Sequence, residues 1–353
     1  PSTAKKSAGS SECASSLSTM ANNPTAATQS LMKRIAGCRM PVDLLMIVKR
    51  ESHCFDSIHS TTCLHTLAKV VQRSDADLAR GPQLQTLLNR QDAELRAILR
   101  HEPRPRRDEA QIVSNTAWAV ARIQVCGDSL REALTSAVTC ALPQFQPRHL
   151  ANTSWALAML LVPGDEPVWS ELASGSIDVM PLRGNPQDIA NTAWAFAACR
   201  FCEPALMEAI SSAAQKQLLE FTARDLSQTA WAFAALLISD ATLIHGLCAA
   251  ATTGLRDASF SVQDAVNMLW SVATLAVRHP PMVIEITRFS VDHANEFRPQ
   301  HLANVVWAVA TLKFRDAVLM EVVSTTATAC MADFDAQSVT NTVWGFAALS
   351  AAS

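Results

Sequence analysis

Residues 186–197 read PQDIANTAWAFA, and this stretch decides the fold because its pattern recurs along the chain. Each copy centres on a tryptophan, and successive tryptophans are 37, 39, 37, 39, 37 and 37 residues apart. A fixed period of this length is typical of a solenoid, in which each unit buries its apolar surface only by stacking on its neighbours. The seven tryptophans in phase are Trp118, Trp155, Trp194, Trp231, Trp270, Trp307 and Trp344.

The same residue types recur at fixed offsets from each of these tryptophans, which we number as position 0. Position +3 is alanine in all seven repeats, position +1 is alanine, serine or glycine, and phenylalanine occupies position −10 in five repeats. Proline occupies position −8 in three repeats. It suits the first position of a helix, because its missing N–H would have no partner there. Asp188, Asp225 and Asp264 follow in the first turn, where a carboxylate complements the helix dipole.

These offsets predict a helix of about four turns in which positions −4, 0, +3 and +4 share one face. We expect the tryptophan to be the large buried side chain of each repeat, and the alanine at +3 to let a neighbouring helix approach closely. A second amphipathic segment follows, for example at residues 204–220, 240–255 and 316–332, and Phe at −10 is expected in the return turn. The sequence therefore predicts an all-α fold, an armadillo-like α-solenoid of helical-hairpin repeats with a period of 37–39 residues.

The chain divides into four predicted segments. Residues 1–30 are rich in Ser, Thr and Ala and are expected to be a disordered lead or the remnant of a transit peptide. Residues 31–100 are expected to form a divergent helical repeat region, in which His65 takes the place of tryptophan and Ala68 that of the +3 alanine. Residues 101–107 are a basic, proline-broken linker. Residues 108–353 contain seven repeats. We interpret the last repeat as truncated and the chain as a fragment of a longer protein.

Composition limits the classes of partner. Ten cysteines without a pairing pattern favour a reducing compartment, and no run is apolar enough to predict a membrane span. Residues 1–110 carry 16 Lys or Arg against 11 Asp or Glu, whereas residues 111–353 carry 13 against 21. The acidic balance of the repeats argues against strong, non-specific phosphate binding by the array as a whole.

The sequence offers no support for catalysis. It contains no G-x-S-x-G, phosphate-binding loop, kinase signature set or H-E-x-x-H motif. Cys199 and Cys202 form a single C-x-x-C, which is a weak signal for a metal or redox site without a second pair. The Cys and His residues within 53–65 form a denser group, but Cys63 and His65 belong to the divergent helix. We therefore expect a protein that is not an enzyme and that holds no cofactor and no metal.

Position −3 carries an amide in every repeat and is the first candidate binding row. A side-chain amide offers two donors and one acceptor, so a row of amides suits the backbone or base edges of an extended polymer. Alternatively, each amide ties one repeat to the next. The residues are Asn115, Asn152, Asn191, Gln228, Asn267, Asn304 and Asn341.

Positions −7 and −6 form the second candidate row, at a helix N-terminus where free N–H groups favour anions. Their variation between repeats is what a base-reading position requires, although ordinary helix capping is the alternative. The linker adds Arg104, Arg106 and Arg107, either as phosphate contacts or as a solvated loop. The candidate contacts at −7 are Arg148, Gln187, Arg224, Gln263, Gln300 and Gln337.

Residues 186–197, and again residues 298–312 (RPQHLANVVWAVATL), resemble the octotricopeptide and heptatricopeptide repeat proteins of organelles. They are also similar to the leucine-rich region of FAST-kinase-like proteins with a RAP domain and to helical-repeat subunits of the RNA-editing substrate-binding complex. Among these families, the sequence most resembles dinoflagellate members. The resemblance covers about residues 60–353. It implies an organellar RNA-binding protein without catalytic activity that acts in RNA processing, stability or editing. The implied location is the mitochondrion, with the plastid as the alternative.

The partners that this resemblance implies are single-stranded RNA and other RNA-processing proteins. The alternative is a protein scaffold that binds an extended peptide or a ribonucleoprotein particle through its groove. Charge separates the two hypotheses. Convergence of Arg148, Arg224, Arg298 and the linker arginines on one face favours RNA, whereas a face lined by aspartates favours peptide.

Overall fold

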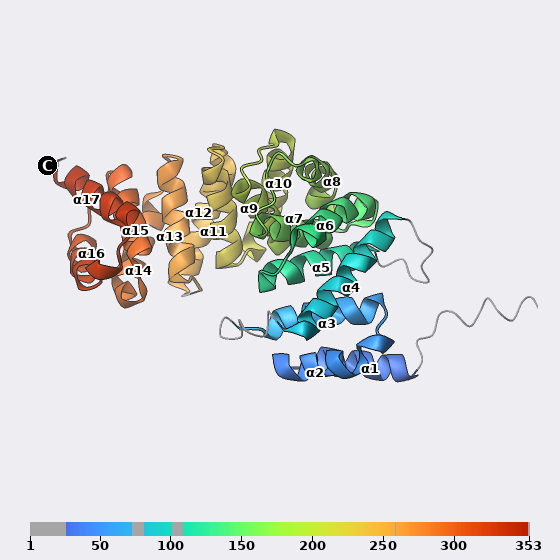
Figure 1. Ribbon diagram of the computed structural model, residues 1–353. Helices are drawn as coiled ribbons and strands as arrows, with labels where there is room; N and C mark the ends of the chain where they lie inside the picture. The colour runs from blue at the N-terminus through green and yellow to red at the C-terminus, as the bar shows by residue number, and fades with distance from the viewer. Residues whose placement is uncertain (1–25, 73–80, 101–108, 258, 352–353) are drawn as a thin grey trace, which may run out of the picture. The chain divides into compact units, whose positions relative to one another are not determined.

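The computed structural model describes residues 26–72, 81–100, 109–257 and 259–351, and its regular structure there is entirely helical. Seventeen α-helices and five short 3-10 turns follow one another in these residues, without a β-strand, which confirms the predicted all-α fold (Figure 1). The chain divides into two compact units, residues 1–137 (unit 1) and 138–353 (unit 2). Most of the predicted lead and all of the predicted linker at 101–107 lie outside the described residues.

Unit 2 is a stack of helical hairpins. The first helix of each hairpin, called the A helix, carries the phased tryptophan: α7 (Pro147–Met159), α9 (Pro186–Ala198), α11 (Ala223–Ala235), α13 (Val262–Thr274), α15 (Pro299–Thr311) and α17 (Ala336–Ala351). The second is the B helix: α8 (Pro167–Arg183), α10 (Pro204–Gln217), α12 (Ala241–Arg256), α14 (Pro280–Asp292) and α16 (Ala317–Ala329). Each A helix packs on the next A helix, and each B helix on the next B helix. The two layers make an α-solenoid.

Unit 1 repeats this alternation. Its helices are α1 (Ala26–Gly37), α2 (Pro41–Glu51), α3 (Ser57–Val70), α4 (Pro82–Leu99), α5 (Glu109–Ile123) and most of α6 (Asp128–Ala141), with the 3-10 turn η1 (Ser52–Cys54) before α3. Helix α3 packs on α1 and α5, and α2 packs on α4. Gln91 of α4 is fully buried, and its Oε1 accepts hydrogen bonds from Thr61 of α3 (3.2 Å) and Thr116 of α5 (2.8 Å). This one amide ties three helices together.

The turn from A to B helix is the same in six repeats. The residue at +6 has a positive φ of 53–59° each time, and its N–H donates to the carbonyl at +3 while the N–H at +7 donates to the carbonyl at +2. In α9, for example, Phe201 N lies 3.0 Å from Phe196 O, and the two rings are 5.8 Å apart. This is the Schellman motif, which usually places glycine at the left-handed residue. Here that residue is Gln124, Leu161, Arg200, Leu237, Ala276 or Lys313.

The return turn contains the phenylalanine at −10, as predicted. Helix α6 and three B helices, α10, α14 and α16, run into 3-10 turns, and the phenylalanine caps each turn in an extended conformation. These turns are η4 (Leu142–Gln144), η5 (Leu218–Glu220), η6 (Ala294–Glu296) and η7 (Met331–Asp333). Phe145, Phe221 and Phe297 are buried. Prolines 147, 186 and 299 begin their A helices, which confirms their predicted role.

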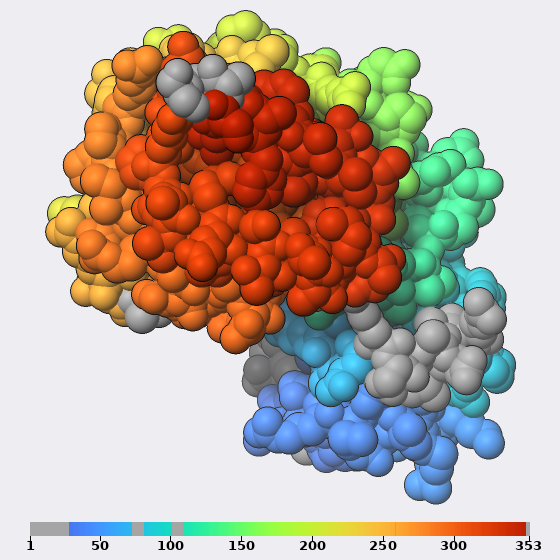
Figure 2. All heavy atoms as spheres, turned by 90° about the vertical axis from the view of Figure 1, so that its left-hand side faces the viewer, coloured from blue at the N-terminus to red at the C-terminus, as the bar shows by residue number. Residues whose placement is uncertain are grey.

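Figure 2 views unit 2 from its C-terminal end, where α16 and α17 face the viewer. Val343 is 63% exposed and Trp344 is 48% exposed, because no described helix packs on the far side of α17. The residues that precede the other phased tryptophans of unit 2 are buried. Among the helices that the structure describes, none is long and apolar enough to cross a membrane.

Candidate functional site

One line of side chains on each A helix of unit 2 faces away from the packed layers. Its positions are −7, −3, 0 and +4, and steps of four, three and four residues return to the same side of a helix with 3.6 residues per turn. These positions are exposed or partly exposed in every A helix of unit 2, whereas positions −5 and −4 are buried in α7 to α15. We call this line the A-helix face.

The phased tryptophans lie on this face, so the prediction that they form the core of each repeat is wrong. All are at least partly exposed, as are the residues at +4, while the alanine at +3 is buried in α5 to α15. The residues at −1 and +1 in α5 to α15 are fully buried. Alanine or serine occupies both positions in α7, α9 and α11, so these A helices approach one another closely, whereas position −1 is Leu269 in α13 and Val306 in α15. The buried tryptophan is the one out of phase, Trp169 of α8, whose ring meets Phe196 edge-on at 5.3 Å.

Two of these partly exposed rings come close to one another across neighbouring repeats. The rings of Trp194 and Trp231 are 6.4 Å apart between centroids and inclined by 31°. In unit 1, the ring of His65 lies 4.9 Å from that of Trp118, so histidine occupies the place of a tryptophan. An indole face that is open to solvent is a surface on which a planar base stacks.

The amide row at −3 is partly exposed throughout. Its side-chain hydrogen bonds stay within a helix: Gln111 Nε2 donates to Asn115 Oδ1 at 2.7 Å, and Gln263 Nε2 donates to Asn267 Oδ1 at 2.8 Å. Among the described residues no hydrogen bond joins a −3 side-chain amide to a neighbouring repeat. Gln228 Oε1 is buried and has no hydrogen-bond partner in the described part of the chain.

The side chains at −7 are all exposed in unit 2. Those of Arg148 and Arg224 form no ion pair with a described residue. Gln263 is held from both sides, because its Oε1 also lies 3.1 Å from His301 Nε2 of the next repeat. The row thus presents two free guanidinium groups and four amides at the N-terminal ends of the A helices.

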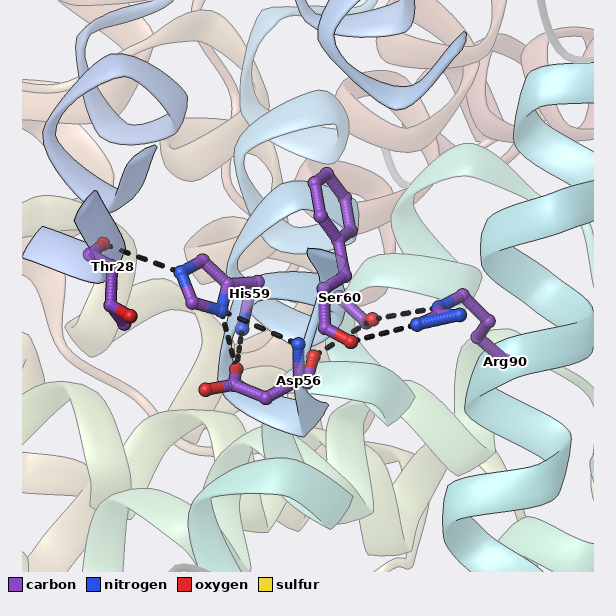
Figure 3. Close-up of polar contacts among 6 residues, drawn as sticks. Thr28, Asp56, His59, Ser60 and Arg90 are labelled. Carbon is purple, nitrogen blue, oxygen red and sulfur yellow. Dashed lines mark hydrogen bonds and ion pairs between the residues drawn. The ribbon is translucent and has the colours of Figure 1, made fainter. Parts of the chain in front are cut away.

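The side chains at −6 serve as caps instead. Figure 3 shows the arrangement at the start of α3: His59 N donates to Asp56 Oδ1 (2.8 Å), and Asp56 N donates to His59 Nδ1 (3.4 Å). Arg90 of α4 donates to the carbonyl of Phe55 at 2.7 Å and holds the same turn. In unit 2 the reciprocal pairs are Asn185 with Asp188 and Thr222 with Asp225, each a complete capping box.

Two caps in unit 2 are half complete. The N–H of Gln146 donates to His149 Nδ1 (3.1 Å), and that of Arg298 to His301 Nδ1 (3.2 Å). The side chain of Gln146 accepts no hydrogen bond from the first turn of α7. The guanidinium of Arg298 has only N–H donors, so it cannot accept one from the first turn of α15. Burial lowers the pKa of His149, and the charge of Arg148 lowers it further; burial and Arg298 do the same to the pKa of His301. Neutral imidazoles accept these bonds.

Charge is distributed unevenly over unit 2. Within its A helices no carboxylate is exposed: Asp188 and Asp225 are buried in caps, and Asp264 is half-buried against Ser227 and Ser261. The exposed acidic side chains lie on B helices and turns, as at Asp178, Glu208 and Glu321. The acidic balance of the repeats is therefore not a property of the A-helix face.

The arginines that separate the two functional hypotheses fall on one edge of unit 2. Arg148, Arg224 and Arg298 lie at the N-terminal ends of α7, α11 and α15, one in every second repeat, and all three are exposed. Arg104, Arg106 and Arg107 lie outside the described residues, so their part in this edge stays a prediction.

The group of Cys and His residues within 53–65 is dispersed by the fold. His59 caps α3, and Cys63 is buried, which raises the pKa of its thiol to about 12. His65 instead points to Trp118. In the C-x-x-C pair, the Cys199 thiol donates to Phe196 O at 3.3 Å.

The fold is an α-solenoid of helical repeats, and its A-helix face presents indoles, amides and cations. Residues 216–353 match the family model of the RNA-editing substrate-binding complex 6 protein. The match begins at the end of α10 and includes the A helices from α11 to α17. No curated protein matches the chain.

Proposed function

We propose that the A-helix face binds single-stranded RNA, and that the protein acts by binding, without catalysis, as a component of an RNA-editing or related RNA-processing assembly. The observation that carries this proposal is the composition of the face: tryptophan, amide and arginine side chains without an exposed carboxylate. The family match over residues 216–353, to a protein named for an RNA-editing substrate-binding complex, supports this assignment. A mitochondrial location follows from the same reasoning, with the plastid as the alternative.

The side chains at positions 0, −3 and −7 suit the face of a base, the edge of a base and the phosphate, respectively. Stacking of a base on an aromatic side chain is worth about 1–3 kcal/mol per base and tolerates any sequence. The amides at −3 lie one turn from the indoles and match donor and acceptor groups on base edges. Arg148 and Arg224 at −7 attract phosphates, aided by the positive end of the helix dipole. Differences between Gln and Arg at −7 then provide a preference between repeats.

The test is binding of the full chain to single-stranded RNA of random sequence, followed by fluorescence anisotropy over a salt series. Trp194→Leu and Trp231→Leu remove stacking surfaces and are expected to weaken binding roughly 5- to 150-fold each, the equivalent of about 1–3 kcal/mol. Trp169→Phe is the matched control, because it changes a tryptophan that is remote from the face. Circular dichroism verifies that the variants keep their helices.

The scaffold hypothesis remains the second candidate, because a row of amides also suits the backbone of an extended peptide. No RNA binding at low salt by a folded chain would overturn the RNA proposal. If protein partners then bind the wild type but not the Trp194→Leu and Trp231→Leu variants, the same face would be assigned to peptide binding.

A further inference from the structure

Unit 1 contains a cleft that lies beside its aromatic pair. The cleft has a volume of about 740 Å³ and is lined by the residues that end α1 and α3 and by the last turn of α5. Three cations line it, and each comes from a different segment: Arg39 follows α1, Lys69 lies in the last turn of α3, and Arg122 in the last turn of α5. No carboxylate is among the lining residues that the structure describes.

Three other arginines of unit 1 are paired with carboxylates. Arg34, Arg96 and Arg131 each hold a carboxylate at 2.6–2.9 Å. Arg39, Lys69 and Arg122 are exposed and form no ion pair with a described residue.

A cation in the last turn of a helix is favoured by the helix dipole, by about 0.3–1 kcal/mol. The dipole explains Lys69 and Arg122 individually. It does not explain why three unpaired cations from separate segments meet in one cleft.

Their register selects the ligand. Lys69 and Arg122 are both at +4, one helical turn beyond His65 and Trp118 at position 0. A turn of helix rises about 5.4 Å, so each cation stands close to one member of the ring pair. The two rings are themselves 4.9 Å apart. Aromatic rings next to a row of cations match a single-stranded nucleic acid, whose bases stack on the rings while its phosphates contact the cations. A small free anion would contact only the cations.

We infer that the cleft lined by Arg39, Lys69 and Arg122 binds the phosphate backbone of a single-stranded RNA whose bases stack on His65 and Trp118. This inference rests on the proposed function, and it assigns to unit 1 a part of RNA binding that depends on salt and not on sequence, in addition to the phosphate contacts proposed for unit 2. Counterions are released as phosphates are neutralised, so the slope of log K against log salt is about −0.7 for each phosphate contact on a single strand.

The experiment compares two double variants of the full chain that remove the same charge. Lys69→Gln/Arg122→Gln empties the cleft of two cations, whereas Lys49→Gln/Arg50→Gln removes two exposed cations from α2, away from the cleft. Binding to oligouridylate and to oligoadenylate is measured over the same salt series for both variants and for the wild type. Circular dichroism checks that each variant is folded.

We expect the cleft variant to lower the magnitude of the salt slope by about 1.4, equally for both oligonucleotides, while the α2 variant keeps the wild-type slope. If the wild type binds RNA and both variants have equal slopes, the cleft assignment is overturned and the proposed function stands. If the wild type binds neither oligonucleotide at low salt, the proposed function itself is overturned, and the cleft assignment with it.

Discussion

The indole rings of Trp194 and Trp231 lie 6.4 Å apart although 37 residues separate them in the chain. Ring pairs at such distances contribute about 0.5–1.5 kcal/mol beyond the area that they bury. The pair is partly exposed, and it exists because the A helices are brought together by small residues beneath it, such as Ala195 and Ala232, which are fully buried. The tryptophans are thus displayed by the packing and do not produce it.

This arrangement predicts unequal effects of tryptophan substitutions on stability. Trp169→Ala is expected to reduce the free energy of unfolding by about 3–5 kcal/mol, because it leaves a cavity against Phe196. Trp231→Ala is expected to cost only about 1–2 kcal/mol, since its ring is already partly in water. Urea unfolding followed by circular dichroism measures both. Equal losses would show that the phased tryptophans belong to the core after all.

The left-handed residue at +6 predicts a stabilising substitution. Ala276 has a φ of 53°, a conformation that costs a residue with a Cβ about 1–2 kcal/mol. Ala276→Gly is therefore expected to raise the free energy of unfolding by about 0.5–1 kcal/mol, after allowance for the greater entropy of the unfolded glycine chain. The matched control is Ala235→Gly, the same change at an exposed helical residue, which is expected to destabilise by a similar amount. Loss of stability in both variants would contradict the interpretation.

The sequence predicts the helical architecture well because its strongest signals are local. The period of the tryptophans, prolines such as Pro186 and the phenylalanines at −10 mark the ends of helices, and the structure confirms each of them. The Schellman turns escape prediction because no glycine marks them: residues as different as Leu161 and Lys313 take the left-handed conformation.

The partial exposure of the phased tryptophans could not be predicted from their hydrophobicity. An apolar ring on an amphipathic helix is expected in the core, but in α7 to α15 the residues at −1 and +1 fill the interface between neighbouring A helices and the ring lies at its edge. The cleft was also hidden in the sequence, since Lys69 and Arg122 are 53 residues apart and meet only through the pairing of α3 with α5. The amides at −3 and the arginines at −7 were found because they recur in register with the period.

The histidine caps predict a dependence of stability on pH. Burial and a neighbouring arginine lower the pKa of His149 and of His301 in the folded chain, so the unfolded chain binds protons more readily. The stability that these caps contribute is fully present above the unfolded pKa of about 6.5 and is lost as the pH falls below it towards the lower folded pKa. His149→Asp/His301→Asp introduces the residue that other repeats use at −6. The double variant is expected to lose less stability than the wild type between pH 7.5 and 5.5, measured by urea midpoints; parallel curves would exclude the caps as the titrating groups.

The half-complete caps predict a separation of stability from binding. Asp56 with His59 shows that aspartate at −9 completes a capping box with histidine at −6. Gln146→Asp and Arg298→Asp are therefore both expected to stabilise the chain by about 0.5–2 kcal/mol, through the cap and the helix dipole.

The two variants are expected to differ in RNA binding, because only Arg298→Asp replaces a cation on the arginine edge by an anion. Arg298→Asp should weaken binding and reduce the salt slope, whereas Gln146→Asp adds a carboxylate without removing a cation and should have the smaller effect. Thermal melts and RNA titrations on the same samples measure both quantities. Arg298→Asp removes one positive charge and adds one negative charge, whereas Gln146→Asp only adds a negative charge. Equal weakening by the two variants would therefore contradict a contact between Arg298 and RNA.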